Sequence, residues 1–161
     1  MYNMMLTSLW QIQAVVPEPI RRPLQPKSHS EEDVRSECQL KPRALVVDDS
    51  TDIAVMLVMI LQHAGYEALM AVSAPEALTL AQREHFDLIV SDIAMPEMDG
   101  YLLAKALRSL PDYRAVPIIA VTGFTEYDDR DRAIDAGFNT HVKKPIDPSS
   151  FIEIVEALRS Q

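Results

Sequence analysis

Three carboxylates follow short apolar segments of the sequence. Asp48 and Asp49 come directly after residues 44–47, and Asp92 ends the segment that begins at residue 88. Carboxylates that lie close together repel one another, which raises their pKa values or requires a cation. Mg²⁺ prefers oxygen ligands, retains several waters and often bridges a carboxylate to a phosphate. If the segments that carry them are neighbouring strands, the three acids indicate a pocket for a divalent metal and a phosphoryl group.

A hydroxyl and an ammonium follow two further segments. Thr122 comes directly after residues 118–121, and Lys144 comes directly after residues 140–143. Ligands of open α/β sheets bind outside the carboxyl ends of the strands. Both side chains are therefore expected at the edge of the same pocket as the three acids.

The segments that position these residues alternate between strands and helices. Strands are predicted at 44–47, 66–72, 88–90, 118–121 and 140–143. Helices are predicted at 52–64, 74–85, 100–109, 126–136 and 147–158. Short, wholly apolar runs such as 44–47 are typical of strands buried on both faces. The alternation predicts an α/β fold with a doubly wound sheet of five parallel strands and helices on both faces.

Local signals mark several helix ends. Gly65 and Gly137 occupy positions where a glycine typically stops a helix, because glycine adopts the left-handed conformation needed there. Ser73 and Glu76 form a predicted capping box, with Pro75 in the first helical turn.

The first 41 residues differ in composition from the rest of the chain. Prolines at 17, 19, 23 and 26 precede a polar stretch. Proline removes a backbone donor and fixes φ, so residues 1–41 are predicted to be a linker or disordered arm before a compact domain over 42–161. The apolar side chains between Leu6 and Ile12 leave two interpretations open. One is an unstructured terminus, which we favour, and the other is a docking peptide for a partner.

Composition excludes several classes of protein. The formal net charge of −9 argues against general nucleic-acid binding, which needs clustered Lys and Arg. The single cysteine, Cys38, cannot form a disulfide within the chain and indicates a reducing compartment, so we expect the cytoplasm. The longest apolar run, Ile53–Leu61, is far shorter than the ~18 residues of a membrane span. The N-terminus lacks the basic leader and cleavage site of a signal peptide.

Four motifs together resemble the response-regulator receiver family. They are Val46–Ser50, Asp92–Gly100, Val121–Gly123 and Lys143–Pro145. Each motif is weak alone, but all four occur in order at the predicted strand ends, within residues 43–159. The resemblance implies a flavodoxin-like strand order, 2-1-3-4-5, in which the first and third strands are neighbours.

The resemblance also implies roles for the acids. Asp92 resembles the phosphoacceptor, whose carboxylate attacks phosphorus in line and forms an acyl phosphate. Asp49, Asp92 and the backbone carbonyl of Ala94 resemble the metal ligands, with Asp48 acting through a metal-bound water. Mg²⁺ is the expected ion and Mn²⁺ the alternative. Without the resemblance, the pair Asp48 and Asp49 is equally consistent with a cap for the following helix.

Four further residues take roles from the family. Lys144 resembles the cation that stabilises charge on the phosphoryl oxygens. Thr122 resembles the hydroxyl that moves to bond one of those oxygens. His141 occupies the position of a switch aromatic, and Pro145 resembles the proline that follows a cis peptide. Without the resemblance, Thr122 is an ordinary strand residue, Lys144 a surface lysine and His141 a packed or half-exposed histidine.

These roles imply a phosphoacceptor switch of a two-component phosphorelay rather than an enzyme that acts on an external metabolite. The expected donor is a histidine kinase or a histidine phosphotransfer protein, docking on the apolar run Ile53–Leu61. Dense core packing is the alternative explanation of that run. We expect a single-domain response regulator without DNA-binding output, or a receiver fragment of a hybrid kinase. We further expect a monomer or weak dimer that does not contact nucleic acid directly.

An enzyme on a similar sheet is the main rival. A haloacid-dehalogenase-like phosphatase needs a second acid two residues after its nucleophile, and Ser50 occupies that position after Asp48. A flavodoxin needs a phosphate loop rich in Ser, Thr and Gly after the first strand, where this chain has two acids. A degenerate receiver that only binds protein is disfavoured because the acceptor, the acid pair, Thr122 and Lys144 are all present.

Ala94 and Phe124 are apolar at positions where the chemotaxis member of the family is polar. They lie two residues after Asp92 and Thr122. We hypothesise that they alter the lifetime of the aspartyl phosphate. The direction stays open, because an apolar wall slows the entry of water whereas a small side chain at Ala94 admits it.

Overall fold

The computed structural model describes residues 41–123 and 128–160. The arm predicted before residue 42, and the docking peptide within it, lie outside the described residues apart from Lys41. The proposed domain boundary therefore stays a prediction.

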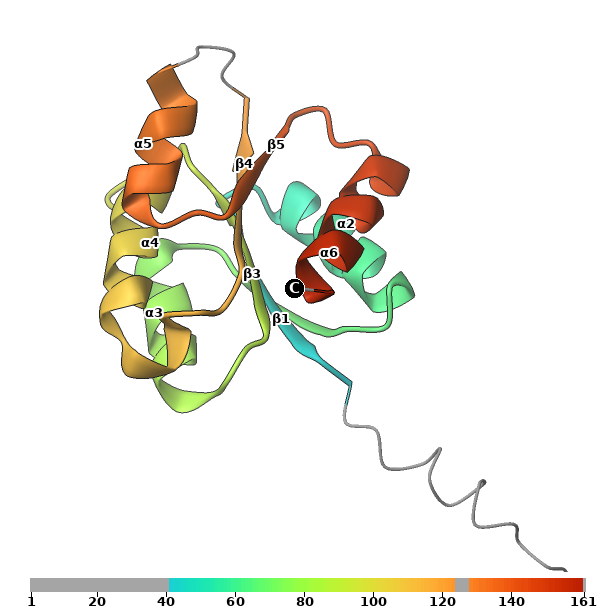
Figure 1. The fold of residues 1–161 in the computed structure, drawn as a ribbon, viewed down its shortest axis with the longest axis horizontal. Helices are drawn as coiled ribbons and strands as arrows, with labels where there is room; N and C mark the ends of the chain where they lie inside the picture. The colour runs from blue at the N-terminus through green and yellow to red at the C-terminus, as the bar shows by residue number, and fades with distance from the viewer. Residues whose placement is uncertain (1–40, 124–127, 161) are drawn as a thin grey trace, which may run out of the picture. The chain divides into compact units, whose positions relative to one another are not determined.

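A sheet of five parallel strands forms the centre of the domain, in the order β2-β1-β3-β4-β5 (Figure 1). The strands are β1 (Arg43–Val47), β2 (Glu67–Ala71), β3 (Leu88–Asp92), β4 (Ile118–Thr122) and β5 (Thr140–Lys143). The fold class and the flavodoxin-like order are therefore confirmed. In this order β3 lies between β1 and β4, which pairs Val47 with Ser91 and Asp92 with Val121.

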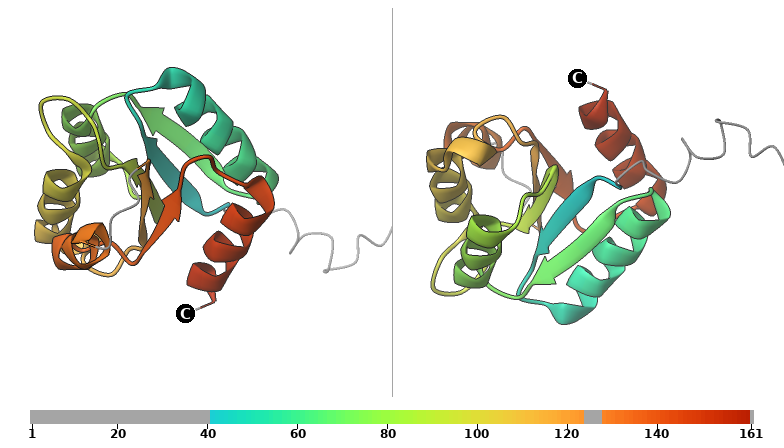
Figure 2. Two further views of the ribbon diagram at one scale, coloured as in Figure 1. Left: turned by 90° about the horizontal axis from the view of Figure 1, so that it is seen from above. Right: turned by 90° about the horizontal axis from the view of Figure 1, so that it is seen from below.

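Helices cover both faces of the sheet (Figures 1 and 2). The helices are α2 (Thr51–His63), α3 (Ala74–Arg83), α4 (Gly100–Ser109), α5 (Asp128–Ala136), α6 (Pro148–Arg159) and the short 3₁₀ helix η1 (Pro111–Tyr113). Successive strand residues point to opposite faces. On β1, Leu45 and Val47 pack with α3, α4 and α5, whereas Ala44 and Val46 pack with α2 and α6. Strands β1, β3 and β4 are thus buried on both faces, as apolar runs such as 44–47 predicted, whereas β2 and β5 are partly exposed.

The local stop signals have the expected conformations. Gly65 and Gly137 have φ values of 89° and 105°, in the left-handed region. Ser73 Oγ accepts a hydrogen bond from the amide of Glu76 at 3.4 Å. The return bond differs from a capping box, because Glu76 Oε2 accepts from the amide of Val72 at 2.8 Å rather than from Ser73.

Two features depart from the sequence prediction. Helix α3 ends at Arg83 rather than at residue 85, and η1 was not predicted. Both differences meet at one contact, in which the Tyr113 hydroxyl of η1 donates to the carbonyl of Glu84 at 2.6 Å. Glu84 is extended, so its carbonyl is available to a residue distant in sequence. Tertiary contacts therefore replace helix propensity at this point.

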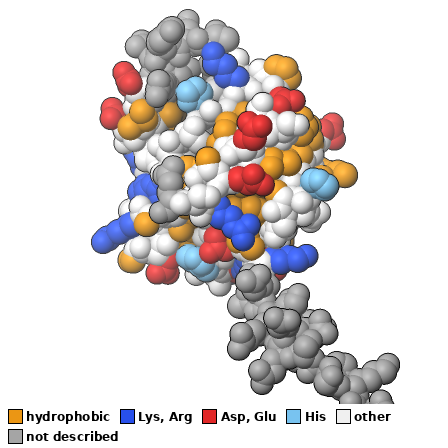
Figure 3. Space-filling view, turned by 45° about the vertical axis from the view of Figure 1, so that its right-hand side comes forward, with side chains coloured by type: hydrophobic (Ala, Val, Ile, Leu, Met, Phe, Trp, Pro, Cys, Tyr) orange, Lys and Arg blue, Asp and Glu red, His pale blue; other side chains and the backbone are white. Residues whose placement is uncertain are grey.

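Helix α2 is apolar on more than one face, as predicted. Ala54 and Leu57 are buried against the sheet. Val55, Met56 and Met59 remain exposed, with Met59 at 65%. Apolar side chains gather on the side of the domain that carries α2 and α6 (Figure 3). Within the described parts of the chain, no helix combines the length and apolar character needed to cross a bilayer.

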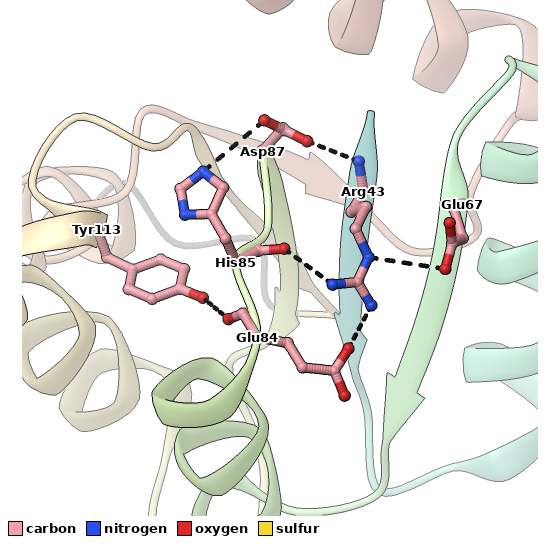
Figure 4. A network of polar contacts seen from close by, with 6 residues as sticks. All are labelled: Arg43, Glu67, Glu84, His85, Asp87 and Tyr113. Carbon is pink, nitrogen blue, oxygen red and sulfur yellow. Dashed lines mark hydrogen bonds and ion pairs between the residues drawn. The ribbon is translucent and has the colours of Figure 1, made fainter. Parts of the chain in front are cut away.

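The amino ends of the strands carry an ionic network around Arg43 (Figure 4). The guanidinium of Arg43 pairs with Glu84 and, at 3.6 Å, with Glu67. Its backbone amide donates to Asp87 Oδ2 at 2.7 Å. These contacts tie β1 to β2 and to the segment between α3 and β3, at the edge of the sheet opposite Asp92.

A second cation, Arg108 at the end of α4, bonds only to neutral acceptors among the described residues. Its guanidinium donates to the carbonyls of Tyr113 and Val116, both at 2.6 Å. It also donates to the carbonyl of Gly137 at 2.7 and 2.9 Å and to Asn139 Oδ1 at 2.8 Å. Burial lowers the pKa of Arg108. The side chain therefore links α4 to the segments that begin β4 and β5.

Candidate functional site

The carboxyl ends of the strands bring the predicted acids together. Asp48 directly follows β1 and is fully buried, and Asp92 ends β3 with 4% of its surface exposed. Lys144 follows β5, and its Nζ donates to Asp92 Oδ1 at 2.8 Å and to Asp48 Oδ2 at 3.0 Å. Asp49 lies next to Asp48 with its residue exposed. A lysine distant in sequence thus bridges two of the three carboxylates.

The alternative that the acid pair merely caps α2 does not account for these contacts. The residue that caps α2 is Ser50, which makes no side-chain capping bond. Asp48 Oδ1 accepts from the amide of Ser50 at 2.9 Å, and its other oxygen bonds Lys144. Asp48 therefore shapes the turn after β1 and bonds Lys144 at the same time.

Electrostatics distinguish the acceptor candidate from an ordinary surface acid. Burial, together with the negative charges of Asp48 and Asp49, raises the pKa of Asp92, although its hydrogen bond with Lys144 acts in the opposite direction. Burial by itself lowers the pKa of Lys144. The hydrogen bonds with Asp92 and Asp48 outweigh that effect, and the pKa of Lys144 is raised. Lys144 is therefore a site cation, not the free surface lysine considered as an alternative.

The residues present fit a divalent metal in donor type and charge. Asp48, Asp49 and Asp92 supply hard oxygen donors, and three carboxylates with one ammonium leave two negative charges for an ion to balance. No three acidic, histidine or cysteine side chains among the described residues are grouped so as to hold a metal by themselves. The expected ligand set is consistent with this, because it includes the backbone carbonyl of Ala94 and a water.

The loop after β3 folds back on the strand end. The amide of Ile93 donates to the carbonyl of Val121 at 3.1 Å and extends the ladder one residue past Asp92. The carbonyl of Ile93 then accepts from the amides of Met95 at 3.1 Å and Gly100 at 2.9 Å. The side chain of Ala94 is exposed within this loop. Phe124, its counterpart in the lifetime hypothesis, lies outside the described residues.

The remaining predicted residues lie around the same edge. Thr122 ends β4, is 4% exposed, and its carbonyl accepts from the amide of Lys144 at 2.8 Å. The peptide bond between Lys144 and Pro145 is cis. His141 is half-buried on β5 and lines a pocket with residues of α5 and the turn that follows it, including Phe138. Lys143, the neighbour of Lys144, is exposed.

Sequence comparison identifies the family to which this geometry belongs. A family model described as the response regulator receiver domain matches residues 44–156. The chain belongs to the response regulator receiver family. It therefore carries the receiver domain of a two-component regulatory system, on a sheet whose strand order agrees with that assignment.

Three relatives illustrate the range of receiver proteins. The chain is 43% identical over 112 residues to an uncharacterized 14.6 kDa protein of Leptolyngbya boryana, covering 70% of this chain and 86% of that protein. It is 34% identical over 113 residues to the polar-differentiation response regulator DivK of Brucella ovis, covering 70% and 92%. It is 36% identical over 118 residues to the probable transcriptional regulator ycf27 of Cyanophora paradoxa, covering 73% of this chain but 48% of that protein.

Solved structures show the same architecture. The chemotaxis protein CheY4 of Vibrio cholerae superposes with a TM-score of 0.71 at 34% identity, covering 74% of this chain and 99% of CheY4. The receiver domain of the sensor histidine kinase PA1611 of Pseudomonas aeruginosa superposes with a TM-score of 0.70 at 26% identity, covering 76% and 100%. The PA1611 structure holds a magnesium ion in its active-site cleft.

Sequence reasoning missed two residues that contact the backbone of Asp92. Ser91 is 1% exposed, and its hydroxyl donates to the Asp92 carbonyl at 2.8 Å. The backbone of Gly100 packs against the same peptide unit. The signal for Ser91 was a small polar residue within an apolar strand. Gly100 was noted only as part of a motif, because a contact between residues eight apart in a loop has no local pattern.

Proposed function

We propose that this receiver domain is a phosphorylation switch whose acceptor is Asp92. The observation that carries the proposal is the buried Asp92 carboxylate, held at the carboxyl edge of the sheet by a lysine that also binds Asp48. An Asp92 oxygen forms the new bond to phosphorus. The bond from phosphorus to the imidazole nitrogen of the donor breaks, and that imidazole keeps the electron pair and takes up a proton.

Lys144 and Thr122 respond to the new group. The ammonium of Lys144, now bonded to Asp92 and Asp48, can follow the charge onto the phosphoryl oxygens. Thr122 ends the neighbouring strand, so its hydroxyl can reach one of those oxygens. We propose that a shift of Thr122 is accompanied by a shift of His141 on β5, which changes the surface formed by α5 and β5.

We propose Mg²⁺ as the cofactor, held by Asp49, Asp92 and the Ala94 carbonyl, with Asp48 acting through water. When bound, the ion neutralises charge on the transferring phosphoryl group. The magnesium ion in the PA1611 receiver domain supports this assignment, as does the negative charge that the three carboxylates leave unbalanced. Mn²⁺, which also accepts carboxylate and water ligands, is the alternative ion.

We further propose that the chain is not an enzyme for an external substrate, and that its donor is a histidine kinase or a histidine phosphotransfer protein. The docking surface is the exposed side of α2, where Met56 and Met59 leave apolar area in contact with water. We also propose a cytoplasmic location, which is supported by the single cysteine, Cys38, since it cannot form a disulfide within the chain. A monomer or weak dimer without direct nucleic-acid contact is consistent with the charge of −9.

The first test is incubation with acetyl phosphate, with and without Mg²⁺, followed by intact-mass measurement. We expect wild type to gain one phosphoryl group only with Mg²⁺, and Asp92→Asn to gain none. A gain that persists in Asp92→Asn would show that another side chain is the acceptor. No gain in wild type, with acetyl phosphate or with a phosphorylated histidine phosphotransfer protein, would refute the switch.

The docking surface is tested separately with Met56→Lys and Met59→Lys. Phosphotransfer from a histidine phosphotransfer protein should slow at least roughly tenfold, whereas phosphorylation by acetyl phosphate should not change, because the pocket is untouched. Ile134→Lys is the matched control, since Ile134 is also apolar and 56% exposed but lies on α5 across the sheet. Equal phosphotransfer rates in all three variants and wild type would exclude α2 as the docking site.

A further inference from the structure

The backbone of Asp92 is bonded by Ser91, a residue that takes no part in the proposed phosphoryl transfer. Ser91 is buried, with 1% of its surface exposed, and its hydroxyl donates to the main-chain carbonyl of Asp92 at 2.8 Å. A hydroxyl without a partner in an apolar environment is unfavourable. In this case the partner is the backbone of the phosphoacceptor itself.

The surroundings of Ser91 favour an apolar residue. On β3, side chains two apart share a face, and both Ile89 and Ile93 belong to the apolar cluster under α3, α4 and α5. A valine would fit this position by strand propensity and would bury more apolar area. The serine is therefore not explained by packing, and its bond to Asp92 is the contact that distinguishes it.

Gly100 packs closely against the same Asp92 carbonyl and bonds the peptide unit that follows it. Its amide donates to the carbonyl of Ile93 at 2.9 Å. A Cβ added at Gly100 would lie 2.9 Å from Ile93 Cα and 3.1 Å from the carbonyl carbon of Asp92. Alanine is a better helix former than glycine by about 1 kcal/mol. The glycine at the start of α4 is thus required by the close approach of the acceptor backbone.

We propose that Ser91 and Gly100 are positioning residues for phosphoryl transfer to Asp92. Together they fix the main chain from Asp92 to Ala94, and so the direction of the Asp92 carboxylate and of the Ala94 carbonyl. The inference rests on the proposed phosphorylation of Asp92. Both residues contact the backbone of Asp92, so their effect is expected on the rate of the chemical step and on metal affinity.

The test compares Ser91→Ala, Ser91→Thr and Gly100→Ala in the full chain. Ser91→Ala should lower the maximal rate of phosphorylation by acetyl phosphate about threefold to tenfold, with the half-saturating concentration of acetyl phosphate unchanged. Ser91→Thr keeps the hydroxyl and should restore the rate. Gly100→Ala should lower the maximal rate of phosphorylation roughly a hundredfold, which is the effect expected when a reacting group is misplaced by about 1 Å. It should also weaken Mg²⁺ binding, followed by NMR shifts of the amides of residues 93–95.

Ser109→Ala is the matched control, because the Ser109 hydroxyl donates to the Ala106 carbonyl at 2.6 Å at the exposed end of α4. It should leave the rate and the Mg²⁺ affinity unchanged. If Gly100→Ala fails to fold, the pair Ser91→Ala and Ser91→Thr carries the test.

Three results would overturn the inference. Wild-type rates in Ser91→Ala and Gly100→Ala would overturn it while leaving the switch intact. Equal slowing in Ser91→Ala and Ser109→Ala would show a general loss of stability. A wild-type protein that takes up no phosphoryl group would remove the proposed function and this inference together.

Discussion

Lys144 and Arg108 are both partly buried cations, and they lie at opposite ends of the same two strands. Lys144 follows β5 and bonds two carboxylates, Asp48 and Asp92. The acceptors of Arg108 precede β4 and β5, and they are neutral carbonyl and amide oxygens. One cation therefore has partners that can gain a proton, and the other has partners that do not titrate.

This difference means that the contacts of Lys144 can change with the charge of their partners, whereas the contacts of Arg108 cannot. An ion pair with a buried carboxylate responds to any change of charge on that carboxylate. A guanidinium that satisfies several carbonyls cannot respond, because arginine keeps its proton and peptide oxygens do not titrate. We infer that the amino ends of β4 and β5 stay in one conformation while their carboxyl ends can rearrange. Four predictions test this comparison.

Arg108→Gln should have the largest effect on stability. The carbonyls of Tyr113, Val116 and Gly137 would lose their donor, and each buried acceptor left unpaired costs about 1 kcal/mol or more. We expect the free energy of unfolding to fall by about 3 kcal/mol in urea denaturation, with the same loss at pH 5 and pH 8. The exposed Arg83 provides the control, and Arg83→Gln should change the free energy by less than about 0.5 kcal/mol. A small loss at Arg108 would mean that water replaces its bonds.

Gly137→Ala should destabilise the protein, because Gly137 accepts two of the hydrogen bonds of Arg108. Gly137 has a φ of 105°, and an added Cβ would lie 2.7 Å from Cγ of Arg108. Gly65→Ala is the matched control, because Gly65 has a φ of 89° but nothing within 4 Å of an added Cβ. Both variants should lose about 1 kcal/mol for the left-handed backbone, and Gly137→Ala should lose about 1 kcal/mol more. Equal thermal shifts in the two variants would show that Arg108 adapts freely.

Asp92→Asn should stabilise the protein at neutral pH. The pKa of Asp92 is raised by burial and by neighbouring acids, so the fold favours the protonated carboxyl. That favourable contribution is present below the ordinary pKa of an aspartate and is lost as the pH rises through the raised pKa. A neutral asparagine should therefore raise the free energy of unfolding at pH 7, and this gain should shrink as the pH falls through the pKa of Asp92. A constant difference from pH 7 to pH 4 would contradict this assignment.

Arg43→Gln should have the smallest effect. The Arg43 side chain is 28% exposed and its partner Glu67 is 61% exposed, so solvent screens the network. We expect a loss of about 0.5 kcal/mol that decreases at high salt. The loss at Arg108 should not depend on salt, since its partners carry no charge. If the loss of stability in Arg43→Gln did not depend on salt, the distinction between the ionic contacts of Arg43 and the neutral contacts of Arg108 would be wrong.

The sequence by itself determined most of the elements and the types of residue at the strand ends. Short apolar runs, glycines at helix stops and a serine before α3 act over a few residues, so their pattern is visible without a structure. The positions of Asp48, Asp92, Thr122 and Lys144 after apolar runs likewise predicted one pocket, because parallel strands end at one edge.

Only the tertiary structure decided which partners these side chains have. From the sequence, Lys144 was equally consistent with a surface lysine. In the structure, its position after β5 brings it beside Asp92 and Asp48, which lie 52 and 96 residues earlier in the chain. Other contacts also join residues that no local pattern connects. They are the bond that accompanies the early end of α3, the hydrogen bonds of Arg108 and the contact of Gly100 with Asp92. A hydrogen bond between distant segments depends on strand order and helix packing, and these are properties of the whole domain.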